Sequence, residues 1–244
     1  MEIKNSVIII TGASSGIGKA TAELLAKEGA KVAMAARSED KLKEIAKNLK
    51  DSFVVKTDMT KPGEIHLMVE KVQNHFGKID VLINNAGRGL HGSIEKLRLD
   101  DYKKIVELNV YGPLIAMQAV IPLMKDQGQG AIVNISSGVS KMVIPNIGGY
   151  ASTKYALNAL TYTARAELLE SGIQVTALYP GLTDTNFSEN TIKNPSESWQ
   201  SRSGLPKADT PEMVAEKVKE AIINGPTEQY MSDEQKERLA FMEI

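Results

Sequence analysis

The sequence predicts a single α/β domain over residues 1–244, in which a doubly wound sheet of seven parallel strands is flanked by helices. Two observations predict this fold. Short apolar runs rich in Val and Ile alternate with longer segments of helical periodicity, which is the pattern of consecutive βαβ units. A glycine-rich turn also joins the first apolar run to the first helix, as at the ligand-binding edge of parallel sheets.

The alternation continues along the chain without a long linker, repeat or low-complexity tract. Parallel strands need crossover connections, and each predicted helix supplies one. The strands are expected near residues 6–11, 31–36, 52–57, 80–84, 130–136, 173–179 and 227–231. The helices are expected near residues 16–28, 39–49, 62–76, 100–126, 149–171 and 209–224.

Two segments do not follow the alternation. Residues 182–209 form a polar stretch with Trp199 and two prolines, which is too long for an ordinary connector. The last residues, 232–244, are charged and then apolar. A solvated helix, a docking tail and part of a subunit contact all fit that pattern.

The composition fits a globular protein whose partners are small molecules. Hydrophobic residues make up 42% of the chain, which is enough for a substantial core. The net charge of −1 and the scattered basic residues create no field that would attract nucleic acid. Because no apolar stretch reaches the ~18 residues of a membrane span, we expect a cytoplasmic protein with no membrane partner.

The chain contains no cysteine, which excludes a disulfide framework, thiolate metal ligands and thiol catalysis. The histidines, His66, His75 and His91, have no ligand-like spacing. No metal site is therefore expected.

The first predicted strand and the turn after it form a candidate phosphate site. The apolar run Ser6 to Ile10 is followed by Thr-Gly-Ala-Ser-Ser-Gly-Ile-Gly, from Thr11 to Gly18, and then by a helix. Glycines let the backbone approach a ligand, while free N–H groups and the helix dipole attract negative charge. The spacing G-x-x-x-G-x-G is longer than G-x-G-x-x-G and indicates a particular subset of doubly wound folds. On this segment alone, a glycine-rich turn that binds nothing is the alternative.

Tyr150 and Lys154 are the strongest candidates for chemistry. They lie four residues apart in a predicted helix, which places both side chains on one face. A phenol normally titrates near ~10, and a nearby ammonium favours its ionised form. Lys154 is therefore expected to lower the pKa of Tyr150. Such pairs also occur by chance, so the pair alone does not establish a catalytic site.

These motifs together resemble those of the short-chain dehydrogenase/reductase family, whose members have a Rossmann fold. The family's glycine motif T-G-x-x-x-G-x-G matches Thr11 to Gly18, and its N-N-A-G motif matches Asn84 to Gly87 after a predicted strand. Its Tyr-x-x-x-Lys pair matches Tyr150 and Lys154, at the family's usual distance from a serine, Ser137. The motifs occur in the family's order over most of the chain.

The resemblance implies an oxidoreductase that transfers a hydride between a nicotinamide cofactor and a carbonyl or alcohol substrate. Tyr150 would be the general acid and base, and Lys154 would also hold the nicotinamide ribose. Ser137 would donate a hydrogen bond to the developing oxyanion. Asn109 would hold a water that links Lys154 to solvent, although a helical asparagine is otherwise often only locally bonded.

The preferred cofactor is predicted at the end of the second strand. Ala36 occupies the position where NAD-binding relatives have an acid for the ribose 2′-hydroxyl, and Arg37 follows it. The fork of donors on an arginine can bind a 2′-phosphate, so NADP(H) is the expected cofactor. The alternative is that Arg37 only pairs with Glu39 or Asp40.

The resemblance carries further cofactor contacts onto loops at the carboxyl ends of the strands. Asp58 resembles the family residue that meets the adenine, although an Asp after a strand can also cap a helix. The segment 182–209 corresponds to the part that covers the substrate. The full set of implied cofactor-binding residues is Gly12, Ser14, Ser15, Gly16, Ile17, Gly18, Arg37, Asp58, Asn85, Ala86, Gly87, Tyr150, Lys154, Pro180, Gly181, Thr183 and Thr185.

Two other functions fit part of this pattern. A regulatory protein could bind NADP without turnover, but it has no use for a proton donor such as Tyr150. A 3-oxoacyl carrier reductase shares the motifs, but the chain lacks the glycine-rich ending usual in that group. Family members commonly pair through helices that correspond to 100–126 and 149–171, so a homodimer or homotetramer is expected. The substrate is not predicted.

Overall fold

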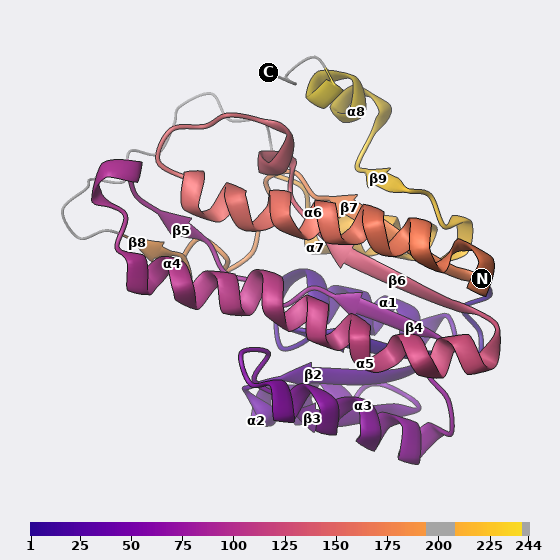
Figure 1. Cartoon of the computed structure of the whole chain (residues 1–244). Coiled ribbons are helices and arrows are strands. Elements are labelled where there is room, and N and C mark those ends of the chain that lie inside the picture. The colour runs from indigo at the N-terminus through magenta and orange to yellow at the C-terminus, as the bar shows by residue number, and fades with distance from the viewer. Residues whose placement is uncertain (194–207, 241–244) are drawn as a thin grey trace.

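The computed structural model describes residues 1–193 and 208–240 and has the predicted doubly wound fold (Figure 1). One sheet has the strand order β3-β2-β1-β4-β6-β7-β9, and all of its neighbouring strands are parallel. The order reverses between β1 and β4, which is where ligands bind in folds of this type. Its strands are β1 (Val7–Thr11), β2 (Lys31–Ala36), β3 (Ser52–Lys56), β4 (Val81–Asn84), β6 (Gly130–Ile135), β7 (Ile173–Tyr179) and β9 (Glu228–Tyr230).

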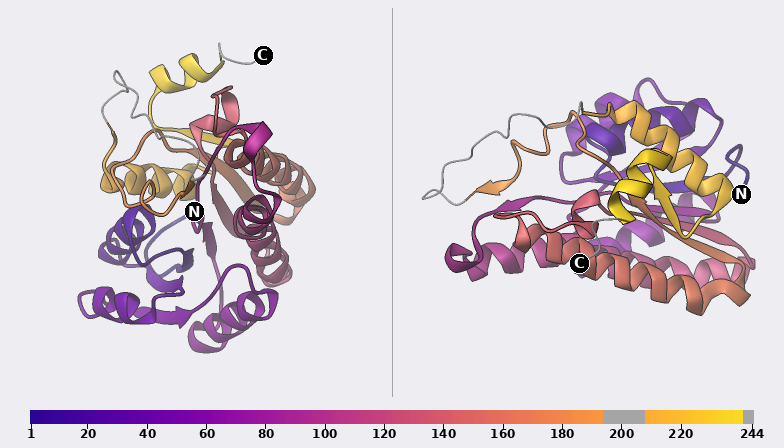
Figure 2. Two further views of the ribbon diagram at one scale, coloured as in Figure 1. Left: turned by 90° about the vertical axis from the view of Figure 1, so that its left-hand side faces the viewer. Right: turned by 90° about the horizontal axis from the view of Figure 1, so that it is seen from above.

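Helices cover both faces of this sheet (Figure 2). One face carries α1 (Gly16–Lys27), α2 (Glu39–Ala46) and α7 (Pro211–Asn224). The other carries α3 (Pro62–Phe76), α5 (Gly112–Gln127) and α6 (Gly148–Leu168). The remaining helical elements are η1 (Ile94–Lys96), α4 (Leu99–Val106), η2 (Glu107–Tyr111), η3 (Gly138–Lys141), η4 (Leu169–Ser171) and α8 (Asp233–Ala240).

Each central strand is buried on both faces, which explains its continuous apolar run. In β1, Ile8 and Ile10 pack with the cluster under α1, α2 and α7. Val7 and Ile9 pack with the cluster under α3, α5 and α6. Side chains alternate between the two faces of a strand, so a strand between two helical layers needs apolar residues at successive positions.

The predicted helix over 100–126 differs from the observed structure. It consists of α4, a π-helical turn η2 and α5. At the end of η2 the chain passes very close to Met59, because a Cβ atom on Gly112 would lie 2.5 Å from the Met59 carbonyl oxygen. A turn with an extra residue inside a helix is often found at functional sites, and η2 contains Asn109.

Among the described residues, the helical stretch Leu99–Gln127 is long and apolar enough to cross a membrane by length and composition. Its inward side chains Ala116, Met117, Val120 and Met124 are at most 2% exposed and pack against the sheet. A core helix of a globular protein passes the same test, so the indication of a membrane span is weak.

Two short strands were not predicted, and the form of the C-terminal residues was left open. The two-residue strands β5 (Leu90–His91) and β8 (Ile192–Lys193) pair as a separate parallel ladder. Helix α8 buries Leu239, which is 1% exposed and lies close to Gly138. Of the alternatives left open for residues 232–244, the structure has a helix, and it packs on the domain through its apolar side; residues 241–244 lie outside the described residues. Elements this short leave no periodicity in the sequence.

Of the long predicted segment 182–209, the structure describes only the two ends, and Trp199 lies outside the described residues. The two ends meet. Asp209 donates from its backbone N–H to the Leu182 carbonyl at 2.8 Å, and Asp184 donates to the Asp209 carbonyl at 2.9 Å. The two ends of the segment are therefore joined beside the carboxyl end of β7.

Candidate active site

The glycine turn after β1 packs directly against the loop after β4. Gly12 has a φ of +68°, and a Cβ atom there would lie 2.9 Å from the Ala86 Cα. A Cβ atom on Gly18 would lie 2.5 Å from both the Asn85 Nδ2 and the Gly12 carbonyl oxygen. These glycines are therefore required for the contact between two loops of the protein as well as for any approach of a ligand.

Asn85 holds these two loops together. Its Nδ2 donates to the carbonyl oxygens of Thr11 and Gly12 at 2.9 and 3.3 Å. In return the Thr11 Oγ1 accepts from the backbone N–H groups of Asn85 and Ala86 at 3.0 and 3.1 Å. Ser15 stands at the start of α1, is exposed, and makes no side-chain cap hydrogen bond. The helix N-terminus is thus accessible beside a loop pair of defined shape.

The structure brings Ser137, Tyr150 and Lys154 together. Ser137 directly follows β6, while Tyr150 and Lys154 lie on α6, which packs against η3. Ser137 lies close enough to Tyr150 for its hydroxyl to lower the pKa of the phenol. The Lys154 Nζ donates to the Ile135 carbonyl at 2.7 Å and lies 6.0 Å from the centre of the Tyr150 ring.

The ionisation of Tyr150 differs from the expectation that Lys154 lowers its pKa. Burial raises the pKa of Tyr150 to about 12, and the hydroxyl of Ser137 opposes this only in part. Burial also lowers the pKa of Lys154 to about 8. Desolvation penalises the charged form of both groups. The Tyr150 phenol is therefore protonated at neutral pH, which is the form that donates a proton.

Asn109 is fully buried in η2, and its amide is used at both ends. Its Oδ1 accepts from the Arg88 backbone N–H at 3.0 Å. Its Nδ2 donates to the Arg88 carbonyl at 2.9 Å and to the Thr153 Oγ1 at 3.0 Å. Gly87 lies close to both Asn109 and Lys154, because a Cβ atom on Gly87 would lie 3.4 Å from the Asn109 Oδ1 and 3.7 Å from the Lys154 Nζ. Asn109 thus connects the end of the N-N-A-G loop to the helix of Tyr150 and Lys154.

Arg37 is exposed at the carboxyl end of β2. Within the described parts of the chain it forms no ion pair, and Glu39 pairs with Lys43 at 2.8 Å instead. Asp58, after β3, accepts at Oδ1 from the Thr60 backbone N–H and Oγ1 at 3.0 and 2.8 Å. Burial would raise the pKa of Asp58, but these hydrogen bonds and the charge of Arg37 hold it below its usual value.

The segment after β7 returns over the glycine turn. The Thr185 Cγ2 lies 3.0 Å from where a Cβ atom on Gly16 would be. The Pro180 carbonyl accepts from the Gly138 N–H at 3.2 Å, and the Thr183 Oγ1 donates to the Gly181 carbonyl at 3.2 Å. The cofactor-binding residues predicted after β7 therefore lie between the glycine turn and the loop of Ser137.

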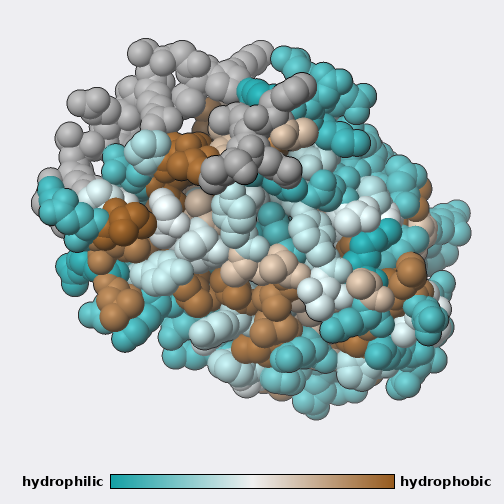
Figure 3. All heavy atoms as spheres, turned by 45° about the horizontal axis from the view of Figure 1, so that its top comes forward, coloured by the Kyte–Doolittle hydropathy of each residue, from teal (hydrophilic) through white to brown (hydrophobic). Residues whose placement is uncertain are grey.

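An apolar wall that no sequence motif marks lies beside Tyr150. The Phe187 ring lies 5.6 Å from the Tyr150 ring, and the Arg88 Nε donates to the Asn190 carbonyl within the same segment. Large exposed apolar side chains from neighbouring segments include Ile94 and Val143. On the face of the molecule drawn in Figure 3, apolar surface gathers at the left, which is the side where Figure 1 shows α4, β5 and β8. These residues match no motif, so only the tertiary structure identifies them.

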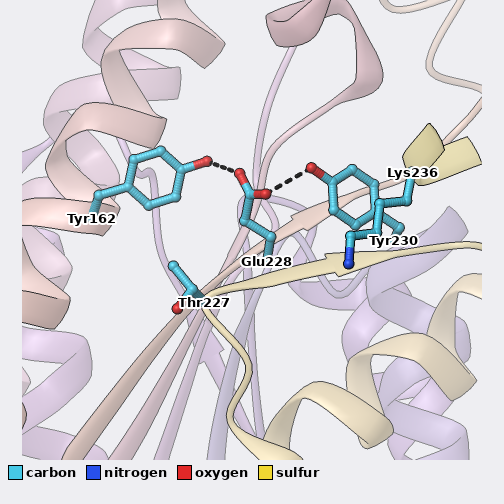
Figure 4. A pocket seen from close by; sticks show the side chains of 5 residues that line it. All are labelled: Tyr162, Thr227, Glu228, Tyr230 and Lys236. Carbon is cyan, nitrogen blue, oxygen red and sulfur yellow. Dashed lines mark hydrogen bonds between the residues drawn. The ribbon is translucent and has the colours of Figure 1, made fainter. Parts of the chain in front are cut away.

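A second polar cluster lies at the β9 edge of the sheet, where Tyr162, Glu228 and Tyr230 border a surface hollow of about 400 Å³ (Figure 4). The Glu228 Oε1 accepts from Tyr162, from Tyr179 at 3.1 Å and from Lys141 at 2.9 Å. Its Oε2 accepts from Tyr230 at 2.7 Å. Because both carboxylate oxygens already have partners, this cluster joins elements of the fold and does not offer a free acceptor to a ligand.

His66 and His75 occupy structural positions. The His66 Nδ1 lies 2.8 Å from the Pro62 carbonyl oxygen, and the His75 ring stacks on Phe53 at 4.1 Å. In the described ranges, no three side chains of the metal-binding types form a group that could hold a metal ion.

The doubly wound sheet, the glycine turn and the Ser137, Tyr150 and Lys154 group at its carboxyl edge define the class of Rossmann-fold oxidoreductases. The protein belongs to the short chain dehydrogenase family, whose sequence pattern matches residues 6–196. It is an oxidoreductase of the type that acts on CH–OH and C=O groups of small molecules.

Known proteins with similar sequences or folds agree with this assignment. An uncharacterized oxidoreductase of Staphylococcus saprophyticus is 40% identical over 192 residues, which are 77% of this chain and 78% of that protein. The alcohol dehydrogenase of the archaeon Thermococcus sibiricus, complexed with 5-hydroxy-NADP, has a TM-score of 0.80 at 32% identity. The match covers 93% of this chain and 96% of that one. The 3-ketoacyl-(acyl-carrier-protein) reductase of Brucella melitensis, complexed with NADH, has a TM-score of 0.82 at 27% identity, with coverage of 90% of this chain and 91% of that one.

Proposed function

We propose that this protein is an NADP(H)-dependent carbonyl reductase or alcohol dehydrogenase in which Tyr150 transfers the proton. The observation that carries the proposal is that the Ser137 hydroxyl lies close enough to Tyr150 to lower its pKa, with Lys154 one helical turn further along α6. Tyr150 is a proton donor, Ser137 has a hydroxyl that can bind the same substrate oxygen, and Lys154 is a cation beside them.

The residues present fit a phosphorylated dinucleotide. Arg37 is exposed and without an ion-pair partner in the described ranges, so its guanidinium is available for a 2′-phosphate. The accessible N-terminus of α1 suits the pyrophosphate, and the ammonium of Lys154 would hold the nicotinamide ribose. When bound, the nicotinamide supplies or accepts the hydride.

The protein's own groups then handle the oxygen of the substrate. A carbonyl oxygen placed between the two hydroxyls receives a hydrogen bond from Ser137 and a proton from Tyr150. One preorganised donor of this kind contributes roughly 2.7–4 kcal/mol to the transition state. Because the pKa of Tyr150 is raised to about 12, its protonated form dominates at neutral pH and favours reduction. Alcohol oxidation needs the ionised phenol and should become faster as the pH rises.

The surroundings of Tyr150 favour an uncharged, apolar carbonyl substrate. Phe187 covers the phenol on one side, and exposed Ile94 lies 3.0 Å from where a Cβ atom on Gly148 would be, two residues before Tyr150. An apolar site recognises substrates by excluding water, and a charged group placed there would lose its hydration.

The direct test is Tyr150→Phe. It removes one hydroxyl and is expected to lower turnover by at least about two orders of magnitude, the usual scale of acid–base catalysis, while NADPH still binds. Turnover is followed by NADPH absorbance with ketones and aldehydes, and NADPH binding by fluorescence titration. An unchanged kcat on a good carbonyl substrate would contradict the proposal. A wild-type protein that binds NADPH but turns over no substrate would support the regulatory alternative instead.

The cofactor preference is tested by Ala36→Asp combined with Arg37→Ser. A hydrogen bond to a charged group contributes about 1.5–3 kcal/mol, or roughly ten- to a hundredfold in affinity. The new acid accepts from ribose hydroxyls and repels a 2′-phosphate, so the double variant should prefer NADH. Titration of both cofactors against both proteins measures the ratio. If the wild type already prefers NADH, the assignment of Arg37 is wrong.

A 3-oxoacyl carrier reductase is the second candidate, favoured by the structural likeness to the Brucella melitensis reductase. A short 3-oxoacyl thioester belongs in the same substrate screen as simple ketones. A kcat/KM at least tenfold higher for the thioester would favour this candidate over a general carbonyl reductase.

We further propose a homodimer or homotetramer assembled through the outer sides of η2 and α6. Tyr111 and Tyr155 are 54% and 46% exposed there. Both side chains are large and partly apolar, so a contact with a second subunit would remove apolar surface from water. Light scattering at micromolar concentration tests this, and a monomer would contradict it.

A further inference from the structure

We propose that Asn158 is a positioning residue that sets the Ser137 hydroxyl opposite Tyr150. This inference rests on the proposed function, because that function gives Ser137 its role. Asn158 lies on α6, the helix of Tyr150 and Lys154, and is 5% exposed. It touches neither the phenol nor the ammonium in any recorded hydrogen bond, and it acts on the loop across from them.

The hydrogen bonds of Asn158 reach both sides of Ser137. The Ser136 Oγ donates to the Asn158 Oδ1 at 2.6 Å. The Asn158 Nδ2 donates to the Ser140 Oγ at 2.9 Å. The Ser140 Oγ in turn donates to the Ser137 carbonyl at 2.7 Å. The relay therefore starts at the residue before Ser137 and ends on the backbone of Ser137 itself.

Every polar group in this relay has the partner that its chemistry requires. A serine hydroxyl carries one proton, an asparagine amide both donates and accepts, and each is used in the same direction along the relay. Ser136 and Ser140 are 4% and 1% exposed, so water does not compete for them. A fully satisfied buried network of this kind holds one geometry, and a broken one leaves unpaired groups.

The position of Asn158 on α6 gives the network its functional meaning. Lys154 and Asn158 are four residues apart, as are Tyr150 and Lys154, so the three side chains follow one face of the helix. Asn158 thus ties the Ser137 loop to the rigid element that carries the other two groups. A shift of about 1 Å in a reacting group can cost a large factor in rate, so a loop that carries a hydrogen-bond donor needs such support.

The test is a double-mutant cycle between Asn158→Leu and Ser137→Ala, measured with NADPH and the best carbonyl substrate from the screen. In the wild-type background, Asn158→Leu should lower kcat about tenfold, with the NADPH dissociation constant changed by less than about twofold. In the Ser137→Ala background it should lower kcat by less than about twofold, because the hydroxyl it positions is gone. Equal factors in both backgrounds would overturn the inference.

Thr161→Val is the matched control. Thr161 is fully buried one turn further along α6, and its Oγ1 accepts from the Asn134 Nδ2 of β6 at 2.8 Å. The change removes a buried hydrogen bond between α6 and β6 without touching the Ser137 loop, so kcat should stay within about twofold. An equal loss in this control would show that Asn158 is only structural and would overturn the inference.

A second variant serves if Asn158→Leu does not fold. Ser140→Ala deletes the bonds of the Ser140 Oγ to Asn158 and to the Ser137 carbonyl but keeps the bond from Ser136 to Asn158, and it should show the same dependence on Ser137. The two proposals fail in different ways. If Ser137→Ala alone leaves kcat unchanged, the role of Ser137 in the proposed function is wrong, and the inference fails with it. If Ser137→Ala lowers kcat strongly but the cycle is additive, only the inference about Asn158 is wrong.

Discussion

The carboxylate of Glu228 makes a pH-dependent contribution to stability that can be worked out from the structure. Burial would raise its pKa, yet the hydrogen bonds from Tyr162, Lys141 and Tyr230 and the charge of Lys141 together hold it at about 2, against an ordinary value of 4.5. The pKa is therefore lower in the folded chain than in the unfolded one. Such a group stabilises the fold above its unfolded pKa, and this stabilisation is lost as the pH falls toward the folded pKa.

The shift sets the size of the effect. One pKa unit corresponds to about 1.36 kcal/mol, so the shift amounts to about 3 kcal/mol at neutral pH. The side chain is 27% exposed, and solvent screens part of this interaction. We therefore expect Glu228→Gln to lower the free energy of unfolding by about 1.5 kcal/mol at pH 7. The difference from wild type should decline below about pH 4.5 and vanish near pH 2.

The assay is urea unfolding of both proteins at a fixed protein concentration, at several pH values between 7 and 3. Glu216→Gln is the matched control, since its carboxylate pairs with Lys219 at 2.8 Å but is 51% exposed. It should change stability by less than about 0.5 kcal/mol. A difference between wild type and Glu228→Gln that stays constant over this pH range would refute the reasoning, as would an equal loss in the control.

Two further changes test the site. Lys154→Met should lower both kcat and NADPH affinity, each by at least about tenfold, because one ammonium is proposed to serve the phenol and the ribose. Steady-state kinetics and cofactor titration measure the two effects. A loss confined to one of them would show that Lys154 has only one of the two roles. Gly18→Ala should lower stability by about 1–3 kcal/mol in urea unfolding and weaken NADPH binding, because its Cβ would lie 2.5 Å from the Gly12 carbonyl oxygen and the Asn85 Nδ2. Unchanged NADPH affinity in this variant would show that the glycine turn is not part of the cofactor site.

Much of the architecture was predictable because it depends on local patterns. A strand buried on both faces must be apolar at successive positions, as β1 is, and a crossover helix must separate parallel strands. The seven strands of the main sheet were predicted in place from this pattern alone. The break of the helix over 100–126 at η2 was not, since it depends on the close approach of Gly112 to Met59.

For the site, the sequence alone determined which residue types are available and where motifs place them: a glycine turn before a helix, and a phenol four residues from an ammonium. The tertiary structure decided what surrounds them. Burial raises the pKa of Tyr150 to about 12, which the i,i+4 spacing with Lys154 did not predict. Phe187 and Asn158 reach the neighbourhood of Tyr150 and Ser137 only through folding. Desolvation and long-range hydrogen bonds depend on which segments meet in space, and no local pattern encodes that.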